Sequence, residues 1–248
     1  MHRAKCLTEA ALHEKLVGKE KERYINRLFG AIAPKYDLLN NVISMGKHKR
    51  WRRLAVSMSG LVTGGKAIDV ATGTGDFALE LSHAAGENGY IIGTDFCIPM
   101  LDLASRKLQG QPGIELVTAN AESLPFASDL FDCATIGFAL RNVADVRATI
   151  AEMVRVTKPG GRVISLEIVG PQSKALQPLW RFYFHKIMPL IAQSIGAERK
   201  HYEYLPDSVA HFYSREELAD IFRNCGLCDL QIRNLTFGIV CIHMGIKR

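Results

Sequence analysis

The stretch AIDVATGTGDFALELS at residues 67–82 decides the fold that this sequence predicts. An apolar run at 67–71 ends in a turn that contains Gly73 and Gly75, and a helix-like segment follows. Glycines at a strand-to-helix turn let the backbone approach a ligand closely at the N-terminus of the helix. A tight turn without a ligand is the structural alternative. The question that these glycines raise is which ligand they would hold.

Outward from this stretch, short apolar runs alternate with helix-like segments. The runs that we expect to form strands are 67–71, 90–95, 114–119, 131–139 and 161–168. Strands that alternate with helices predict an α/β fold, with a parallel sheet and helices on both of its faces. The KPGG sequence at 158–161 predicts a turn immediately before the last of these strands, and residues 227–248 alternate like a closing hairpin.

Two segments interrupt this rhythm. Residues 1–60 carry helical apolar spacing that breaks at Pro34, and we expect an N-terminal helical cover segment there. Residues 61–248 form the predicted main domain, with an aromatic-rich helical lid inserted at about 171–213. A chain of 248 residues with 48% hydrophobic content can bury one sizeable core, so we expect one structural domain overall.

The composition of the chain predicts its cellular compartment and the kind of surface it contacts. The six cysteines are scattered and no apolar signal segment precedes them, so we expect a cytoplasmic protein without a disulfide framework. No run approaches the roughly 18 apolar residues of a membrane-spanning helix. The formal net charge of +6 favours an anionic surface as a partner, which is either phospholipid or nucleic acid.

The charges around the glycine turn discriminate between two ligands. The turn satisfies a permissive dinucleotide fingerprint, and Asp95 follows the second strand where such sites place an acid. However, Asp69 and Asp76 flank the turn, and two carboxylates disfavour a diphosphate. S-adenosylmethionine instead carries a sulfonium and an ammonium group and no phosphate. The residue chemistry therefore favours this methyl donor, with a nicotinamide dinucleotide as the rival.

Two further positions agree with the methyl donor. Asp95 is placed to accept both hydroxyls of a ribose, a demand that the two ligands share. Asn120, Ala121 and Glu122 follow the third strand and are ready to contact the edge of an adenine.

Five stretches of the sequence resemble a known family. The stretches that carry the resemblance are YDLLNNVISMGKHKRWRR (36–53), DVATGTGDFALEL (69–81), ANAESLPFASDLFDCATIGFALRNVADV (119–146), EMVRVTKPGGRVISLE (152–167) and YLPDSVAHFYSREELADIF (204–222). They closely resemble the ubiquinone/menaquinone biosynthesis C-methyltransferases, and the resemblance covers nearly everything from about Arg23 to the end. It implies a class I S-adenosylmethionine-dependent methyltransferase with a Rossmann-like, mostly parallel seven-stranded sheet.

The resemblance also implies functional residues. In the family, the positions that match Thr74, Asp95, Asn120 and Ala121 contact S-adenosylmethionine. The sequence departs from the family at Gly137, where a serine hydroxyl usually contacts the cofactor, so only a backbone contact is expected there. This departure leaves room for a paralogue with a shifted substrate. The cofactor-binding residues that we predict are Asp69, Gly73, Thr74, Gly75, Asp95, Asn120, Ala121 and Gly137.

The implied reaction is methyl transfer to a ring carbon of a reduced, prenylated quinol, with demethylmenaquinol as the first expected acceptor and the benzoquinol precursor of ubiquinone as the second. The ring carbon is a poor nucleophile until a neighbouring hydroxyl loses its proton, so a base or a cation that stabilises the phenolate is needed. Arg141 is the predicted cation, and a surface ion pair with Asp145 is its alternative role. Asp76 is the predicted base, acting through a water directly or through Arg141, and a helix cap is its alternative role.

The prenyl tail requires an apolar channel. Residues 178–191 offer aromatic side chains for a mobile lid, with core packing as the alternative. Tyr202, Tyr204 and His48 are expected to bind the substrate. The basic run at 47–53 is interpreted first as a solvated face, and contact with the inner face of the membrane, which suits a lipid substrate, and RNA binding are the alternatives.

The expected partners are therefore a prenylated quinol and a peripheral membrane surface, with no nucleic acid and with a homodimer left open. No histidine or cysteine spacing predicts a metal site, and methyl transfer of this kind needs no metal. Three alternative functions stay open: a methyltransferase for another small molecule or for a phospholipid, a methyl-donor-binding protein without catalysis, and an NAD-binding oxidoreductase.

Overall fold

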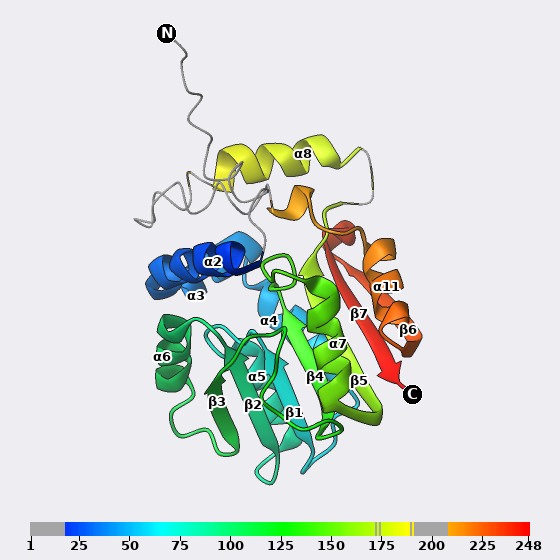
Figure 1. Ribbon diagram of the computed structural model, residues 1–248. Helices are drawn as coiled ribbons and strands as arrows, with labels where there is room; N and C mark the ends of the chain where they lie inside the picture. Colours follow the sequence, from blue (N-terminus) through cyan, green and yellow to red (C-terminus); the bar gives the residue numbers. More distant parts are fainter. Residues whose placement is uncertain (1–17, 172, 174, 189, 191–207) are drawn as a thin grey trace.

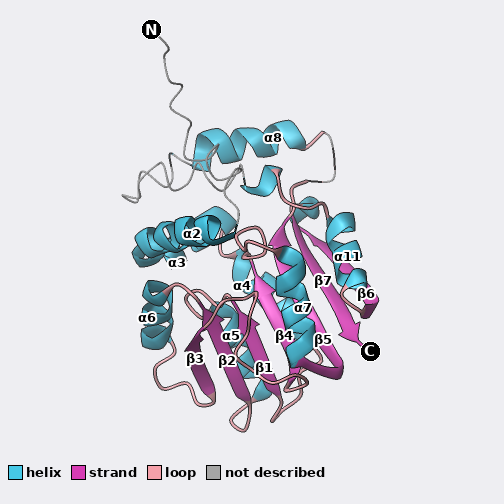
Figure 2. Cartoon of the chain, in the orientation of Figure 1, coloured by secondary structure: helices cyan, strands magenta, loops and turns pink. Residues whose placement is uncertain are grey.

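One seven-stranded sheet with helices on both faces forms the centre of the molecule (Figures 1 and 2). The computed structural model describes residues 18–171, 173, 175–188, 190 and 208–248. The strands are β1 (Lys66–Val70), β2 (Tyr90–Asp95), β3 (Ile114–Thr118), β4 (Phe131–Gly137), β5 (Thr157–Ile168), β6 (Leu227–Leu235) and β7 (Val240–Lys247). Their order is β3-β2-β1-β4-β5-β7-β6, with β1 to β5 parallel and β7 antiparallel to both of its neighbours. The predicted α/β fold with a closing hairpin is confirmed.

The helices connect the strands and extend over one end of the sheet. They are α2 (Gly18–Ile32), the 3₁₀ turn η1 (Ala33–Lys35), α3 (Tyr36–Ser44), α4 (Lys47–Met58), α5 (Asp76–Ala85), α6 (Ile98–Lys107), α7 (Val146–Val156), α8 (Gln177–Phe182), the π-helical turn η2 (Tyr183–Ile187), α11 (Arg215–Asn224) and the 3₁₀ turn η3 (Thr236–Gly238). The helical spacing predicted for the N-terminal segment is confirmed over α2, α3 and α4. Its expected break at Pro34 is confirmed by η1.

The core has one layer on each face of the sheet. Ile68 of β1 packs with Ile150 of α7 and Phe222 of α11, whereas the preceding residue, Ala67, packs with Phe77 of α5 on the opposite face. Successive side chains of a strand point to opposite faces, so a strand that is buried on both sides reads as a continuous apolar run. This is why the strand runs of the sequence were uninterrupted rather than alternating.

The KPGG sequence differs from its prediction. It lies within β5, where Phe131 pairs with Thr157 and Cys133 pairs with Arg162, so residues 158–161 bulge out of the ladder. A Cβ on Gly161 would lie 2.7 Å from a backbone oxygen of β4, which explains the glycine at this position. The predicted turn before the strand is therefore wrong in its boundary, because pairing with β4 begins one residue ahead of it.

Helices α2 and α3 and the described part of the insertion lie over the carboxyl ends of the parallel strands, whereas α4 packs on one face of the sheet (Figure 1). Met188 is fully buried and packs against Leu39 of α3, and the Tyr183 hydroxyl donates a hydrogen bond to the Ile43 carbonyl at 3.3 Å. The described part of the insertion thus packs on the cover helices rather than in the core of the sheet. Tyr202 and Tyr204 lie outside the described residues. Among the helices of the described segments, none is both long enough and apolar enough to cross a bilayer.

Candidate functional site

The glycine turn holds a carboxylate at the end of the neighbouring strand. Gly73 and Gly75 have φ angles of 56° and 83°, in the left-handed region that favours glycine. The backbone N–H of Gly73 donates to one carboxylate oxygen of Asp95 at 2.8 Å, and the N–H of Cys97 donates to the other oxygen at 2.8 Å. Burial raises the pKa of Asp95, while these backbone hydrogen bonds oppose the rise. Two main-chain donors thus fix the Asp95 side chain in one orientation.

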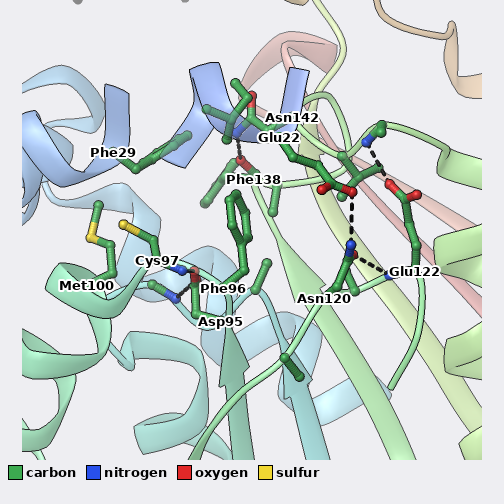
Figure 3. A pocket seen from close by; sticks show the side chains of 18 of the residues that line it. Glu22, Phe29, Asp95, Phe96, Cys97, Met100, Asn120, Glu122, Phe138 and Asn142 are labelled. Atoms are coloured by element: carbon green, nitrogen blue, oxygen red, sulfur yellow. Dashed lines mark hydrogen bonds between the residues drawn. The ribbon is translucent and has the colours of Figure 1, made fainter. Parts of the chain in front are cut away.

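Beside Asp95 lies a pocket at the carboxyl ends of β1 to β4, which we call the strand-end pocket (Figure 3). It has an empty volume of about 750 Å³, counting its open mouth. The predicted cofactor residues that line it are Gly73, Asp95, Asn120, Ala121 and Gly137. The structure therefore brings together five of the eight positions.

The charge of the strand-end pocket bears on the ligand that the glycines hold. Its described lining includes the carboxylates of Glu22, Asp95 and Glu122, and it contains no lysine, arginine or histidine. A diphosphate would lie beside acids without a compensating cation, which is unfavourable in a partly dehydrated site. The pocket accordingly suits a ligand that carries positive charge and hydrogen-bond donors.

The other three predicted cofactor residues are not among the residues that line this pocket. Asp69 accepts hydrogen bonds from the hydroxyls of Thr72 and Thr135, and burial raises its pKa to about 7. The hydroxyl of Thr74 donates to Asp37 at 2.6 Å. A Cβ on Gly75 would lie 2.7 Å from the side chain of Leu108, so this glycine allows close helix packing. These three residues therefore stabilise the turn through contacts within the protein rather than line the pocket.

Gly137 lines the strand-end pocket directly below an aromatic ring. A Cβ at this position would lie 2.9 Å from Cδ2 of Phe77. Native Cβ atoms do not approach other atoms that closely, so a serine here would require Phe77 to move. The missing hydroxyl at Gly137 is thus coupled to the packing of α5.

A second and larger cavity, the apolar chamber, lies between the cover helices and the insertion. It has an empty volume of about 1830 Å³, counting its open mouth, and its wall is mostly apolar, with side chains from α2, α3, α4, α8, η2 and η3. Of the predicted catalytic and substrate-binding residues, His48 and Arg141 line it. Phe29, Tyr36 and Phe138 line both cavities, so the strand-end pocket and the apolar chamber meet at these three side chains.

Arg141 is held at the wall of the chamber by a buried acid. Its Nη1 donates to Glu167 at 2.7 Å and to the Phe138 carbonyl at 2.8 Å. Burial raises the pKa of Glu167, and the charge of Arg141 opposes this rise. The alternative ion pair with Asp145 is wrong, because Asp145 instead caps α7 by accepting from two backbone N–H groups. The buried Nε of Arg141 has no hydrogen-bond partner among the described residues.

Asp76 lies in a charged cluster beneath the cover helices rather than beside Arg141. It pairs with Lys107 at 2.8 Å and with Arg52 at 3.3 Å. Burial alone would raise the pKa of Asp76, but Arg52 and Lys107 outweigh that effect and lower it. The expected action of Asp76 through Arg141 is therefore not supported, because Arg141 is bound to Glu167 instead. The expected helix cap is also wrong, since Gly75 occupies the N-cap position without a side-chain hydrogen bond.

His48 belongs to the same cluster. Its Nε2 lies 2.9 Å from the side-chain oxygen of Asn41, and its Nδ1 contacts the guanidinium of Arg52. Burial, followed by the charge of Arg52, lowers the pKa of His48 to about 4. The ring is therefore neutral near pH 7 and its two nitrogens are engaged within the protein. His48 lines the chamber with ring atoms, while its hydrogen bonds orient Arg52.

Comparison with known proteins agrees with this geometry. Residues 17–247 match the model of the ubiE/COQ5 methyltransferase family. The chain belongs to this family. It is 38% identical to a demethylmenaquinone methyltransferase of Staphylococcus saprophyticus, covering 92% of this chain and 98% of that protein. It is 40% identical to a ubiquinone/menaquinone biosynthesis C-methyltransferase, UbiE, of Desulfotalea psychrophila, covering 90% of each.

Solved structures give the same fold. A SAM-dependent methyltransferase of Thermotoga maritima, a possible histamine N-methyltransferase, superposes with a TM-score of 0.63 at 21% identity, covering 90% of this chain and all of that chain. For this member of the ubiE/COQ5 family, the predictions of the fold class, of the family and of an S-adenosylmethionine-dependent methyltransferase are confirmed. The low identity to the Thermotoga protein limits that comparison to the fold.

Sequence reasoning missed several residues of the site. Glu167 is fully buried between Leu166 and Ile168 near the end of β5, and an acid beside these apolar residues was a usable signal. Phe138, with a φ of 59°, follows β4 at the junction of the two cavities, and nothing in its sequence neighbourhood predicts this backbone conformation. Lys107 and Arg52 contact Asp76 from segments that are far apart in the chain, so no local pattern could reveal the cluster.

Proposed function

We propose that this protein transfers a methyl group from S-adenosylmethionine to a ring carbon of reduced demethylmenaquinone. The benzoquinol precursor of ubiquinone is the second candidate for the acceptor. The observation that carries the proposal is the meeting of a carboxylate-lined pocket and a large apolar chamber at Phe29, Tyr36 and Phe138. A methyl transfer needs donor and acceptor in contact while each is held by groups of its own polarity. The names of the relatives from Staphylococcus and Desulfotalea support the same choice of acceptor.

The strand-end pocket suits the methyl donor. Asp95 is oriented by two backbone N–H groups and would accept the ribose hydroxyls, and Asn120 with Ala121 would contact the adenine. When bound, S-adenosylmethionine supplies an electrophilic methyl group. The chain's own contribution is to orient it towards the junction of the cavities and to exclude water behind the cover helices.

The apolar chamber suits a prenylated quinol. Two of its lining residues, Asn40 and Arg141, each have a buried nitrogen without a hydrogen-bond partner among the described residues. A buried donor without an acceptor is unfavourable, so a quinol oxygen that reached these groups would gain from them. The guanidinium of Arg141 would stabilise a phenolate, whose negative charge makes the ring carbon nucleophilic.

Asp76 has a different role in this proposal. Its lowered pKa makes it a weak base, and it lines neither cavity. We assign Asp76 as a positioning residue that fixes Arg52 and Lys107, and through them the glycine turn and the cover helices. The proton acceptor for the quinol is then a water molecule rather than a side chain of this cluster.

A membrane surface is the proposed source of the substrate. Met45, Leu179 and Phe237 line the chamber and are 73%, 65% and 83% exposed, so its mouth has an apolar rim. Lys47 is an exposed cation at the same mouth. Only the exposed residues of the run 47–53 can contact the membrane, because His48 and Arg52 are buried. Flotation with liposomes should increase with their anionic lipid content, and binding that ignores this content would contradict the contact. A homodimer stays a prediction.

The test of the function uses methyl-labelled S-adenosylmethionine with reduced demethylmenaquinone or, separately, with the demethylated ubiquinone precursor. Organic extraction and mass analysis then locate the label. We expect label in the naphthoquinone ring, and label in both quinones would extend the function to a second pathway. Absence of label from both, with cofactor binding intact, would contradict the proposed acceptor and favour another small molecule or a phospholipid.

A further inference from the structure

Glu22 is an acid in the strand-end pocket that the reaction described above does not use. It lies on α2, is half-buried, and lines the pocket from the side of the cover helices (Figure 3). One of its carboxylate oxygens accepts a hydrogen bond from the side-chain amide of Asn120 at 2.9 Å. No lysine or arginine of the described residues lies within ion-pair distance of it, although most other acids around the site have such a partner or a backbone donor. Glu22 therefore has acceptor capacity that the described residues do not use.

The neighbouring polar groups orient Glu22 and are themselves engaged. The side-chain oxygen of Asn120 accepts from the N–H of Glu122, so both ends of the Asn120 amide are occupied. One carboxylate oxygen of Glu122 accepts from the backbone N–H groups of Ala144 and Asp145. These contacts hold the Asn120 amide in place, and its N–H₂ group in turn points the Glu22 carboxylate along the end of β3.

The position of Glu22 indicates which part of the methyl donor it would meet. In the sheet order β3-β2-β1-β4, Asp95 ends β2, Asn120 follows β3, and the glycine turn follows β1. With the ribose at Asp95, the proposed contact of the adenine with Asn120 puts the base on the β3 side, beside Glu22, and the amino-acid end on the β1 side. The base, not the ammonium group, is the neighbour of Glu22.

We propose that the Glu22 carboxylate recognises the exocyclic amine of the adenine, so that the cover helix α2 itself selects the base of the cofactor. This proposal rests on the proposed use of S-adenosylmethionine. An amine N–H donates, and a carboxylate is a stronger acceptor than a neutral carbonyl. Hypoxanthine has a carbonyl oxygen in place of the amine, and that oxygen would face the Glu22 carboxylate without a donor. Such a mismatch at a built polar site is rejected more strongly than a difference in apolar size.

The test is isothermal titration calorimetry of the full chain with S-adenosylhomocysteine and with S-inosylhomocysteine. We expect the wild type to prefer the adenosine compound by a factor of roughly ten or more. Glu22→Gln keeps an oxygen that can accept from Asn120, so the tether between α2 and the Asn120 loop is preserved. Its amide can also donate to the carbonyl of hypoxanthine, so the preference should shrink towards one or reverse.

Glu20→Gln is the matched control, because Glu20 lies on the same helix and is exposed. This control should keep the wild-type preference. A Glu22→Gln variant that weakens both ligands equally, or leaves the preference unchanged, would overturn the proposal. Failure of the wild type to bind S-adenosylhomocysteine at all would instead overturn the proposed cofactor, so the two failures are distinguishable.

Discussion

The strand-end pocket and the apolar chamber are built in different ways. In the pocket, polar groups follow the ends of β1 to β4, and main-chain donors orient them, as the Gly73 and Cys97 N–H groups do for Asp95. The chamber is walled by helices and turns from distant parts of the chain, and its wall holds buried donors on Asn40 and Arg141 that lack a partner among the described residues. We infer that the wall of the pocket formed by the strand ends is rigid, whereas the chamber exists only when the cover helices are in place.

The largest expected effect is at Arg141, where the chamber supplies charge to the reaction. Arg141→Met alone would leave Glu167 buried without its cation and would destabilise the fold by about 3 to 5 kcal/mol. The double variant Arg141→Met, Glu167→Gln removes that buried charge and should fold. We expect its kcat to fall by about 10² to 10³, because a group that stabilises developing negative charge is lost. Quinol methylation with purified protein is the measurement, and a double variant within threefold of the wild-type kcat would sink the role of Arg141.

The next effect separates the pocket from the chamber. Asp95→Ala removes the acceptor for the ribose hydroxyls, so affinity for S-adenosylhomocysteine should fall about a hundredfold. Partition of a prenylated quinone into the chamber should not change. Asp102→Ala, at an exposed position on the neighbouring helix α6, is the control for calorimetry. Equal loss of both ligands in Asp95→Ala would mean that the two cavities are not independent.

A smaller effect is expected at the mouth of the chamber. Leu179→Asp places a charge on its apolar rim and should raise KM for a long-tailed quinol by about tenfold, given the value of burying one leucine side chain. Turnover of a tail-less quinol should stay the same. Ile98→Asp changes an apolar side chain of similar exposure on α6, where it lines neither cavity, and should leave both substrates unaffected. If the tail-less quinol lost as much as the long-tailed one, the rim would not be a tail site.

The smallest effect concerns the floor of the strand-end pocket. Gly137→Ser should lower the free energy of unfolding by roughly 1 to 2 kcal/mol, since its Cβ would overlap with Phe77. In a Phe77→Leu background the same substitution should cost less, because the ring that it meets is gone. Urea unfolding of the four proteins gives the coupling. Purely additive costs would show that Phe77 is not what requires Gly137.

The contrast between the two cavities also explains what the sequence could predict. The polar residues of the pocket stand immediately after apolar strands, and parallel strands bring their carboxyl ends to one edge, so Asp95 and Asn120 could be placed together from local pattern alone. Arg141 was likewise found because it follows β4. The ion pair with Asp145, which was the alternative role of Arg141, is wrong, because Arg141 pairs with Glu167, 26 residues away on the neighbouring strand β5.

The cluster around Asp76 shows the limit of local reasoning. Its partners Arg52 and Lys107 come from α4 and α6, and only the packing of the cover helices on the sheet brings them together. The acid could be singled out from its place after Gly75. Its role, as a general base or as an ion-pair partner, depends on the cations Arg52 and Lys107. No pattern of sequence spacing places these two residues beside Asp76.

The most direct test of the central claim is a crystal structure of the full chain with S-adenosylhomocysteine and a demethylmenaquinone. We expect the adenosine beside Asp95 and Asn120, the naphthoquinone ring in the apolar chamber, and the sulfur facing the ring beside Phe138, which lines both cavities. A quinone ring bound elsewhere, or a ring and an adenosine that compete for the strand-end pocket, would contradict the two-cavity account.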